Sequence, residues 1–336
     1  MKLHSRLLCV PFLVFLINCT APETSRATAA SQNASTNQAF GKAAITAETR
    51  SPLYVSSDQG QTWKAVLSNL PDDTQVSFME MMGPHMLIAT DNLGLYVGNQ
   101  SFTHFEMISE ALPSKKLNAL HIDGQTIYVG VYREGIYQSD DLGRTWQSLN
   151  FDLPNLRVQA IKVYDGQLVV GIDDGIYQFD KKSSKWESLY TDIQVLSLES
   201  LKGAWIAGTS RGTLKSTNQG KDWQWIHEIG AVHYTHIVGE QIVEMIIMED
   251  VFFSQDLGET WTAANYAPRE ASYVYEVVKM DSSLILSNNY GIHRSTDGGK
   301  NWQHISATEE AAFFDLYPRG KLLYGGTRAW DEFRKR

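Results

Sequence analysis

One eight-residue motif, Ser-x-Asp-x-Gly-x-Thr-Trp, recurs along the chain and limits the possible folds more than any other feature. Three copies match it fully, at residues 56–63, 139–146 and 254–261, and two looser copies lie at residues 216–223 and 295–302. Two eroded copies keep only the final aromatic residue. The seven final aromatic residues are Trp63, Phe105, Trp146, Trp186, Trp223, Trp261 and Trp302. Their regular spacing of about 40 residues is the length of one four-stranded blade of a β-propeller.

The chemistry of the motif is that of a tight turn. A short Asp side chain accepts hydrogen bonds from nearby backbone N–H groups, and Gly adopts a positive φ without strain. The final Trp supplies a large apolar surface that we expect to pack between blades. We therefore expect a structural role for Asp58, Gly60, Trp63, Asp141, Gly143, Trp146, Gly220, Trp223, Asp256, Gly258, Trp261, Asp297, Gly299 and Trp302.

The sequence between the motifs also repeats. Residues 117–139, 158–179 and 195–216 align with one another, and each segment reads as three strands. The ends of the chain complement one another. Residues 311–327 read as a first and a second strand, whereas residues 51–67 read as a third and a fourth. Joining them would complete a seventh blade and remove open sheet edges. The sequence therefore predicts an all-β, seven-bladed propeller over residues 43–336, although residues 43–47 are a competing second strand.

With these motifs, the chain resembles the Asp-box (BNR) repeat propellers. That family includes sialidases, xyloglucanases, sortilin-type receptor domains and the photosystem II stability/assembly factors. A single ring behind a secretion signal is most similar to the assembly-factor-like group. The resemblance implies the fold, but unrelated activities share it.

The amino terminus resembles a bacterial lipoprotein signal. Lys2 and Arg6 precede an apolar run that is too short to span a bilayer, and the run ends at Cys19. We expect residues 1–18 to be a signal peptide, Cys19 to be acylated, and residues 19–42 to form a flexible tether. The alternative is a soluble secreted protein cleaved near Ala21 or Ala29. Either form would lie in the bacterial cell envelope, facing the periplasm or the exterior, or be secreted.

Composition excludes several classes of function. The net charge of -9 and the lack of clustered Lys and Arg argue against a nucleic-acid partner. The chain has only two Cys, both within its first nineteen residues, so a disulfide scaffold or a Cys-based metal site is not expected. No glycine-rich phosphate loop precedes a helix, and we expect no cofactor.

Catalytic signals are weak. The sialidase Arg-Ile-Pro or Arg-Leu-Pro motif does not occur in the sequence. Xyloglucanases of this class work between two propellers, and the chain is long enough for one. No metal site is expected, because no segment has the spacing of a calcium loop. His233 and His236 lie on a predicted inner strand without a third ligand nearby, so we expect them in the core or the channel.

A partner would bind the face that carries the turns between the second and third strands of each blade. Binding residues commonly lie on loops of a rigid scaffold. The predicted partner-binding residues are Asp91, Arg133, Glu134, Asp173, Asp174, Arg211, Glu249, Asp250, Tyr290 and Arg328. Their charges favour a basic or mixed-charge partner. Nearer the axis, Asn118, Gln159, His233, Tyr275 and Glu276 are candidates to face the channel.

The sequence thus predicts a non-catalytic, membrane-anchored propeller that binds or assembles an envelope protein or complex. The membrane is contacted through the lipid anchor only. The alternative hypothesis is an extracytoplasmic glycoside hydrolase or a carbohydrate-binding propeller.

Overall fold

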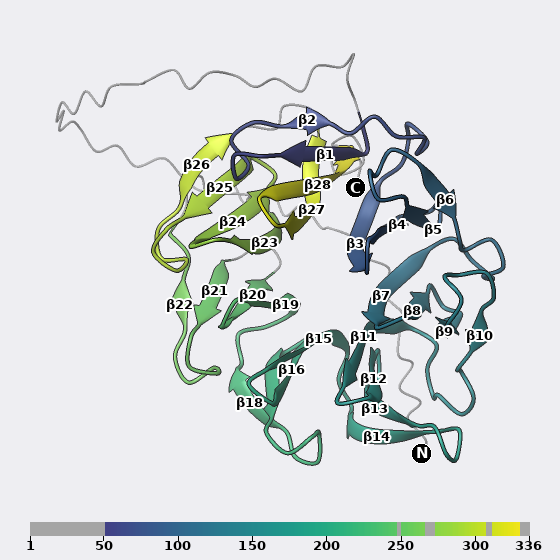
Figure 1. Cartoon of the computed structure of the whole chain (residues 1–336). Coiled ribbons are helices and arrows are strands. Elements are labelled where there is room, and N and C mark those ends of the chain that lie inside the picture. Colours follow the sequence, from purple (N-terminus) through teal and green to yellow (C-terminus); the bar gives the residue numbers. More distant parts are fainter. Residues whose placement is uncertain (1–50, 247–249, 266–272, 307–310, 330–336) are drawn as a thin grey trace, which may run out of the picture. The chain divides into compact units, whose positions relative to one another are not determined.

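The computed structural model describes residues 51–246, 250–265, 273–306 and 311–329. The expected signal peptide, Cys19, the tether and residues 43–47 lie outside these ranges. Within them the chain forms strands only, arranged as seven four-stranded antiparallel sheets around a central axis (Figure 1). No helix of the described part is long and apolar enough to cross a membrane.

We number the blades along the chain, with the closing blade as blade 7. Blade 1 comprises β3 (Val76–Met82), β4 (His85–Thr90), β5 (Leu95–Gly98) and β6 (Phe105–Met107). Blade 2 comprises β7 (Leu117–Asp123), β8 (Thr126–Val131), β9 (Gly135–Ser139) and β10 (Gln147–Ser148). Blade 3 comprises β11 (Val158–Tyr164), β12 (Gln167–Ile172), β13 (Gly175–Asp180) and β14 (Lys185–Thr191). Blade 4 comprises β15 (Val195–Leu201), β16 (Ala204–Thr209), β17 (Gly212–Ser216) and β18 (Gln224–His227). Blade 5 comprises β19 (Val232–Val238), β20 (Gln241–Ile246), β21 (Val251–Ser254) and β22 (Thr262–Ala263). Blade 6 comprises β23 (Val274–Met280), β24 (Ser283–Asn288), β25 (Gly291–Ser295) and β26 (Gln303–Ser306). Blade 7 comprises β27 (Ala311–Arg319), β28 (Leu322–Ala329), β1 (Leu53–Ser56) and β2 (Lys64–Ala65).

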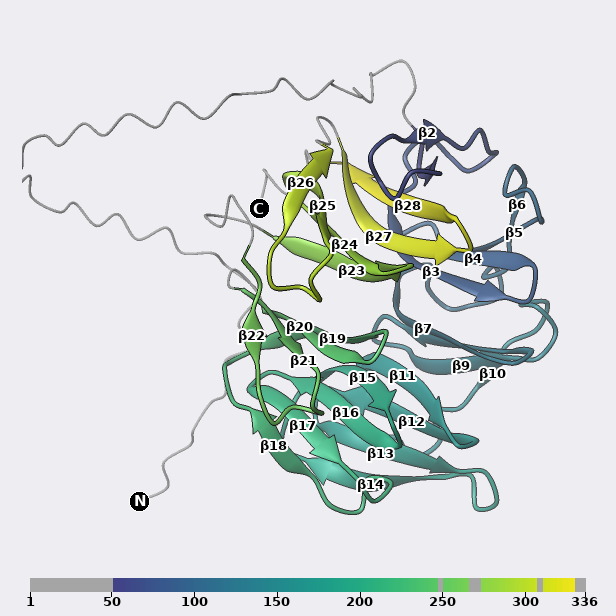
Figure 2. The same ribbon diagram turned by 60° about the vertical axis from the view of Figure 1, so that its left-hand side comes forward.

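The two ends of the described chain close the ring, as the sequence predicts. Strand β1 pairs with β28, with Leu53 opposite Gly326 and Ser56 opposite Leu323. The sheet order is β2-β1-β28-β27, so early and late segments share one blade. Strands β27 and β3 also lie side by side in both views (Figures 1 and 2). Closure leaves no blade without a neighbour on either side, which protects the sheet faces from solvent.

The core lies between the blades. The second strand of a blade is buried along its whole length in blades 4 and 6, whereas short outer strands such as β10 are exposed. A sheet face that packs against a neighbouring sheet must be apolar, so second strands lack the alternation of a half-exposed strand. The apolar clusters accordingly join residues of two neighbouring blades, such as Ile136 of blade 2 with Ile161 and Val170 of blade 3.

The Asp-box turns close on themselves by hydrogen bonds. In the first box, Asp58 Oδ1 accepts from Ser56 Oγ at 2.8 Å and from the Thr62 backbone N–H at 2.9 Å, while Gly60 N donates to Ser56 Oγ at 2.8 Å. The boxes at residues 139–146, 216–223, 254–261 and 295–302 repeat this pattern, with Asn218 in place of Asp in the second of these.

The final Trp of a box connects either to its own turn or to a neighbouring blade. Trp63 Nε1 donates to Gly60 O at 3.0 Å within its own box. Trp146 Nε1 instead donates to Ile108 O in the connection after blade 1, at 2.9 Å, and Trp261 Nε1 donates to Ile226 O of blade 4, at 3.2 Å. The bonds of Trp146 and Trp261 connect adjacent blades at the outer part of the sheets.

Candidate functional site: the turn face and the central channel

Antiparallel pairing places the turns between second and third strands, and the connections between blades, at the same ends of the sheets. We call this surface the turn face. Its described residues are 51–52, 66–75, 91–94, 108–116, 132–134, 149–157, 173–174, 192–194, 210–211, 228–231, 250, 264–265, 273 and 289–290. The opposite ends of the sheets carry the Asp boxes.

Eight of the ten predicted partner-binding residues fall on the turn face. These are Asp91, Arg133, Glu134, Asp173, Asp174, Arg211, Asp250 and Tyr290. Glu249 lies outside the described residues. Arg328 belongs to strand β28 rather than to a turn, and its side chain is outside the description.

Several of these side chains are held by residues of the turn face or of the strands next to it. Asp173 accepts hydrogen bonds from Arg157 at 3.2 Å, Gln159 at 3.2 Å and Gln194 at 2.8 Å. The Arg211 guanidinium lies 5.2 Å from the centre of the Trp225 ring. Such contacts fix the orientation of the polar groups and so reduce the entropy that a partner would have to remove.

Exposed apolar side chains are concentrated on the turn face. Among the described residues, the large apolar side chains that remain exposed there are Leu67, Tyr132, Phe151, Leu156, Tyr273 and Tyr290. Only two others, Met107 in β6 and Leu322 at the start of β28, lie elsewhere in the described part. Lys116 and Arg133 flank the ring of Tyr132, at 4.7 Å and 5.1 Å from its centre. Aromatic and Arg side chains of this kind are enriched where proteins bind one another.

Below the turn face, the innermost strands line the central channel with titratable side chains. The hydrogen-bond registers align one position in all seven first strands. The residues at this position, from blade 1 to blade 7, are Glu80, His121, Lys162, Glu199, His236, Val278 and Tyr317. Two residues earlier, blades 6 and 7 carry Glu276 and Asp315.

Part of this wall is a chain of close polar contacts between basic and acidic side chains. Lys162 Nζ lies 2.6 Å from Glu199 Oε2, and Glu199 Oε1 lies 3.9 Å from His236 Nδ1. His236 Nε2 in turn lies 3.8 Å from Glu276 Oε2. Each contact joins two neighbouring blades, so the chain crosses three blade interfaces.

Other carboxylates of the wall accept backbone hydrogen bonds from the next blade. Glu80 Oε2 accepts from Ile122 N at 3.1 Å, and Asp315 Oδ2 accepts from Met79 N. The innermost strand of each blade is a sheet edge with unpaired N–H groups. Acceptors at these positions therefore have a structural use as well as any binding role.

Burial changes the protonation of the wall. It raises the pKa of Glu276 to about 8 and that of Glu80 to about 7, and it raises the pKa of Asp315 well above its ordinary value. Burial lowers the pKa of His121 to about 4 and also lowers the pKa of His236. At neutral pH the channel thus retains protons on carboxyl groups while its imidazoles are neutral.

A cavity of about 400 Å³ opens against this wall, lined by residues of β3, β19, β23 and β27 that include Glu80, His236, Glu276 and Asp315. The carboxyl groups can donate or accept hydrogen bonds, depending on their protonation. Within the described ranges, no group of three His, Cys, Asp or Glu side chains is arranged to hold a metal ion.

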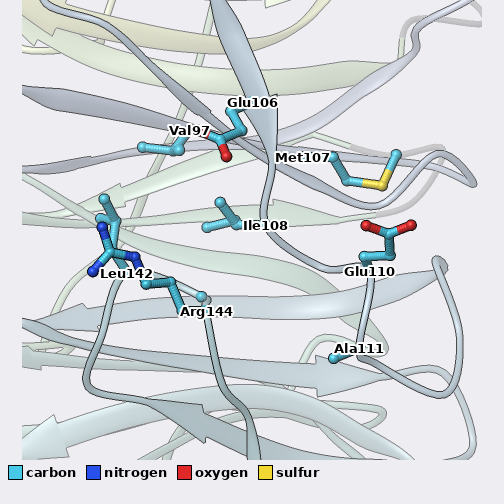
Figure 3. A pocket seen from close by; sticks show the side chains of 9 residues that line it. Val97, Glu106, Met107, Ile108, Glu110, Ala111, Leu142 and Arg144 are labelled. Atoms are coloured by element: carbon cyan, nitrogen blue, oxygen red, sulfur yellow. The ribbon is translucent and has the colours of Figure 1, made fainter.

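A second pocket of about 450 Å³ lies between β5 and β6 of blade 1 and the Asp box of blade 2. Two exposed carboxylates, Glu106 and Glu110, and the guanidinium of Arg144 line it together with Met107. Figure 3 shows Arg144 and Glu110 at opposite sides of this pocket. Neither carboxylate is singled out by the repeat pattern in the sequence.

The sequence located only part of the channel wall. Glu276 and His236 line the cavity, but Tyr275 is buried and Gln159 donates to Asp173 on the turn face. Asn118 is the bulged residue of β7, at the position that Gln159 occupies in β11. The side chain of His233 is outside the description. Sequence reasoning missed Glu80, His121, Lys162, Glu199 and Asp315. Aligning the repeats at the Asp boxes and counting back to the first strands would have revealed a titratable column.

The repeat motif is recognised by a family model. The BNR/Asp-box repeat model matches residues 54–65 and 293–304, which contain the first and last boxes. The chain is therefore a β-propeller that carries BNR/Asp-box repeats. No curated protein matches the sequence of this Asp-box propeller.

Solved structures share the fold at low sequence identity. YCF48 from Cyanidioschyzon merolae is similar with a TM-score of 0.62 and 15% identity, over 79% of this chain and 96% of its own. PorZ, a surface component of the type-IX secretion system of Porphyromonas gingivalis, has a TM-score of 0.54 and 12% identity, over 75% of this chain and 34% of its own. The GH74 xyloglucanase of Xanthomonas campestris has a TM-score of 0.56 and 14% identity, over 68% of this chain and 45% of its own. These similarities establish the fold of the Asp-box propeller, and its function has to be inferred from its own surface residues.

Proposed function

We propose that this Asp-box propeller is a non-catalytic binding or assembly platform for an envelope protein, and that its turn face carries the partner. The observation that supports this most strongly is the concentration of exposed apolar side chains on that face. Tyr132, Tyr273 and Tyr290 offer large, rigid contact areas, and the Arg133 guanidinium lies 5.1 Å from the centre of the Tyr132 ring. Solvent-exposed apolar groups gathered on one face of a rigid scaffold are typical of interaction surfaces.

Two of the structural relatives support a protein partner. One solved structure is YCF48 bound to D1 peptide, similar to this chain with a TM-score of 0.61 and 15% identity. PorZ is described as a bacterial surface component of a secretion system. The first is an example of the shared fold bound to a peptide, and the second is an example of the fold in a component of a secretion system. The present proposal extends the binding of a protein partner to this chain.

We further propose that Cys19 is acylated and that residues 19–42 tether the propeller to a membrane. The tether would keep the turn face within reach of membrane-bound partners. Cys19→Ser is expected to abolish incorporation of a fatty-acid label and to move the protein from the membrane fraction to the soluble fraction. Continued membrane association of unlabelled Cys19→Ser would contradict the anchor while leaving the platform proposal intact.

The platform proposal is tested by affinity purification of the full-length lipidated protein from its own membranes. We expect one envelope protein or complex to co-purify in near-equal amount, and the double variant Tyr132→Ser/Tyr290→Ser to reduce that yield at least about tenfold. The matched control is Met107→Ser/Leu322→Ser, which removes exposed apolar groups away from the turn face. Equal loss in both variants, or no loss in either, would refute the assignment of the turn face.

The second candidate function is glycoside hydrolysis or carbohydrate binding, and the pocket of Glu106 and Glu110 is what favours it. Glycosidases work with two carboxylates on either side of the bond that is cleaved. In a screen against polysaccharides, hydrolysis that is lost in both Glu106→Gln and Glu110→Gln would support this function and contradict a non-catalytic platform. We expect no turnover in the screen.

A further inference from the structure

Every blade interface is built around the same three positions. One lies on the third strand of a blade, and the other two are a cross-strand pair on the first and second strands of the next blade. In six of the seven interfaces these positions hold no polar side chain. The six sets are Leu53 with Met79 and Ile88, Leu95 with Leu120 and Val129, Ile136 with Ile161 and Val170, Ile176 with Leu198 and Ala207, Val251 with Val277 and Leu286, and Ile292 with Leu316 and Gly325.

The interface between blades 4 and 5 has polar residues at all three positions. They are Thr213 on β17 and the cross-strand pair Thr235 and Glu244 on β19 and β20. Their exposed fractions are 0%, 1% and 0%. Thr213 Oγ1, Thr235 Oγ1 and Glu244 Oε1 are buried, and none of the three has a hydrogen-bond partner among the residues that the structure describes. The three departures from the apolar pattern therefore meet at one place.

The surrounding contacts show that these side chains face one another's blades. A Cβ atom added to Gly208 of blade 4 would lie 2.5 Å from Thr235 Oγ1, so Thr235 points into blade 4. Thr213 is the cross-strand neighbour of Gly208 on that same blade surface. On the blade 5 side, Glu244 reaches across to His227 of β18.

His227 fixes the Glu244 carboxylate. Its Nδ1 lies 2.6 Å from Glu244 Oε2, and its ring stacks on Trp261 with a centre-to-centre distance of 4.5 Å and an angle of 10°. Phe252 meets the His227 ring edge at 5.2 Å. Because one carboxylate oxygen is held in this way, the carboxylate cannot turn its other oxygen toward an alternative donor.

Three unsatisfied buried oxygens at one interface would destabilise the fold, because each would have lost its hydrogen bonds to water without a replacement. Buried polar groups of this kind usually share an internal water, which needs two to four polar partners. A carboxylate oxygen only accepts, whereas each Thr hydroxyl can donate or accept. One water can donate to Glu244 Oε1 and to one hydroxyl while accepting from the other, which satisfies all three. A calcium ion would instead require six to eight oxygen ligands, about twice as many as the site offers.

We propose that the interface between blades 4 and 5 is a small-ligand site that holds one buried water molecule, bound by Glu244, Thr213 and Thr235. This inference is independent of the proposed function. It makes one interface of the ring different from the six apolar ones, because its cohesion depends on a bound molecule as well as on side-chain packing.

The sign of a stability change tests the proposal. Thr213→Val and Thr235→Val each remove a hydroxyl at nearly constant shape. If the hydroxyl binds water, each variant lowers the Tm by about 1 to 3 °C. If the site is empty, each variant removes an unsatisfied polar group, and the Tm rises or stays unchanged. Thr209→Val, which removes a hydroxyl that donates directly to Gly212 O at 2.7 Å, calibrates the size of the fall.

The double variant and a crystal structure complete the test. Once the first hydroxyl is lost, the water is held more weakly, so Thr213→Val/Thr235→Val is expected to lower the Tm by less than the sum of the single shifts. Additive shifts would overturn a shared water. A crystal structure of the propeller at high resolution should show one oxygen peak within about 3.2 Å of all three side-chain oxygens. An empty site, or a peak with the coordination of a cation, would refute the proposal.

Discussion

Replacing Glu276 by Gln is expected to stabilise the propeller at pH 8 and to leave its stability at pH 5 nearly unchanged. Glu276 lies in the channel wall with a side chain only 14% exposed, 3.8 Å from His236. Burial favours its protonated form and raises its pKa from 4.5 to about 8. Glutamine has the shape of the protonated acid but cannot ionise, so it does not have to hold a proton in the folded state.

The sign and size of this stability change follow from proton linkage. The folded protein binds the Glu276 proton more tightly than the unfolded chain, so this stabilisation is fully present below pH 4.5 and is lost as the pH rises to about 8. At about 1.4 kcal/mol per pKa unit, the interval from 4.5 to about 8 corresponds to about 5 kcal/mol. Water in the channel screens a charge there, so we expect a measured gain of about 2 kcal/mol for Glu276→Gln at pH 8.

The assay is chemical denaturation of the wild type and Glu276→Gln at pH values from 5 to 8.5, followed by tryptophan fluorescence. Other titrating groups are common to both proteins, so their effects cancel in the difference curve. Glu187→Gln, the same change on the exposed strand β14, is the matched control and should give a flat difference. A flat difference curve for Glu276→Gln as well would refute the view that burial holds a proton on this carboxyl group.

Two further predictions concern other charges. Hydrogen bonds from Thr145 lower the pKa of Asp141 from 3.8 to about 2, so its contribution to stability is present above about pH 4 and is lost as the pH falls through about 2. Asp141→Ala should lower the Tm at pH 7, and the difference from the wild type should shrink in thermal scans as the pH falls toward 2. In a double-mutant cycle of Lys162→Met and Glu199→Gln, measured by denaturation, the half-buried pair should show a coupling energy of about 2 kcal/mol. The exposed pair Lys202 and Glu240 is the control, with about 0.3 kcal/mol expected; equal coupling in the two pairs would contradict the role of burial.

The amino-acid sequence by itself determined the number of blades and the closure of the ring. The Asp-box turns are local, because their Ser, Asp, Gly and Thr interact within eight residues. Their pattern can therefore be recognised in the sequence, and its spacing gives the length of one blade. The split of blade 7 could also be predicted, because residues 51–67 and 311–327 each supply half of a repeat whose complete form occurs elsewhere in the chain. Strand pairing in β1 and β28 follows from that count.

Only the tertiary structure decided which side chains meet across the blades. Lys162 and Glu199 are 37 positions apart, and His227 and Glu244 lie on different blades. A shift of one residue in register reverses the face of every side chain in a strand, and each first strand contains a bulge that makes such a shift. The channel wall and the polar interface between blades 4 and 5 depend on those registers. Local turn chemistry therefore specified the architecture, whereas the sites arose from contacts between strands that local chemistry does not encode.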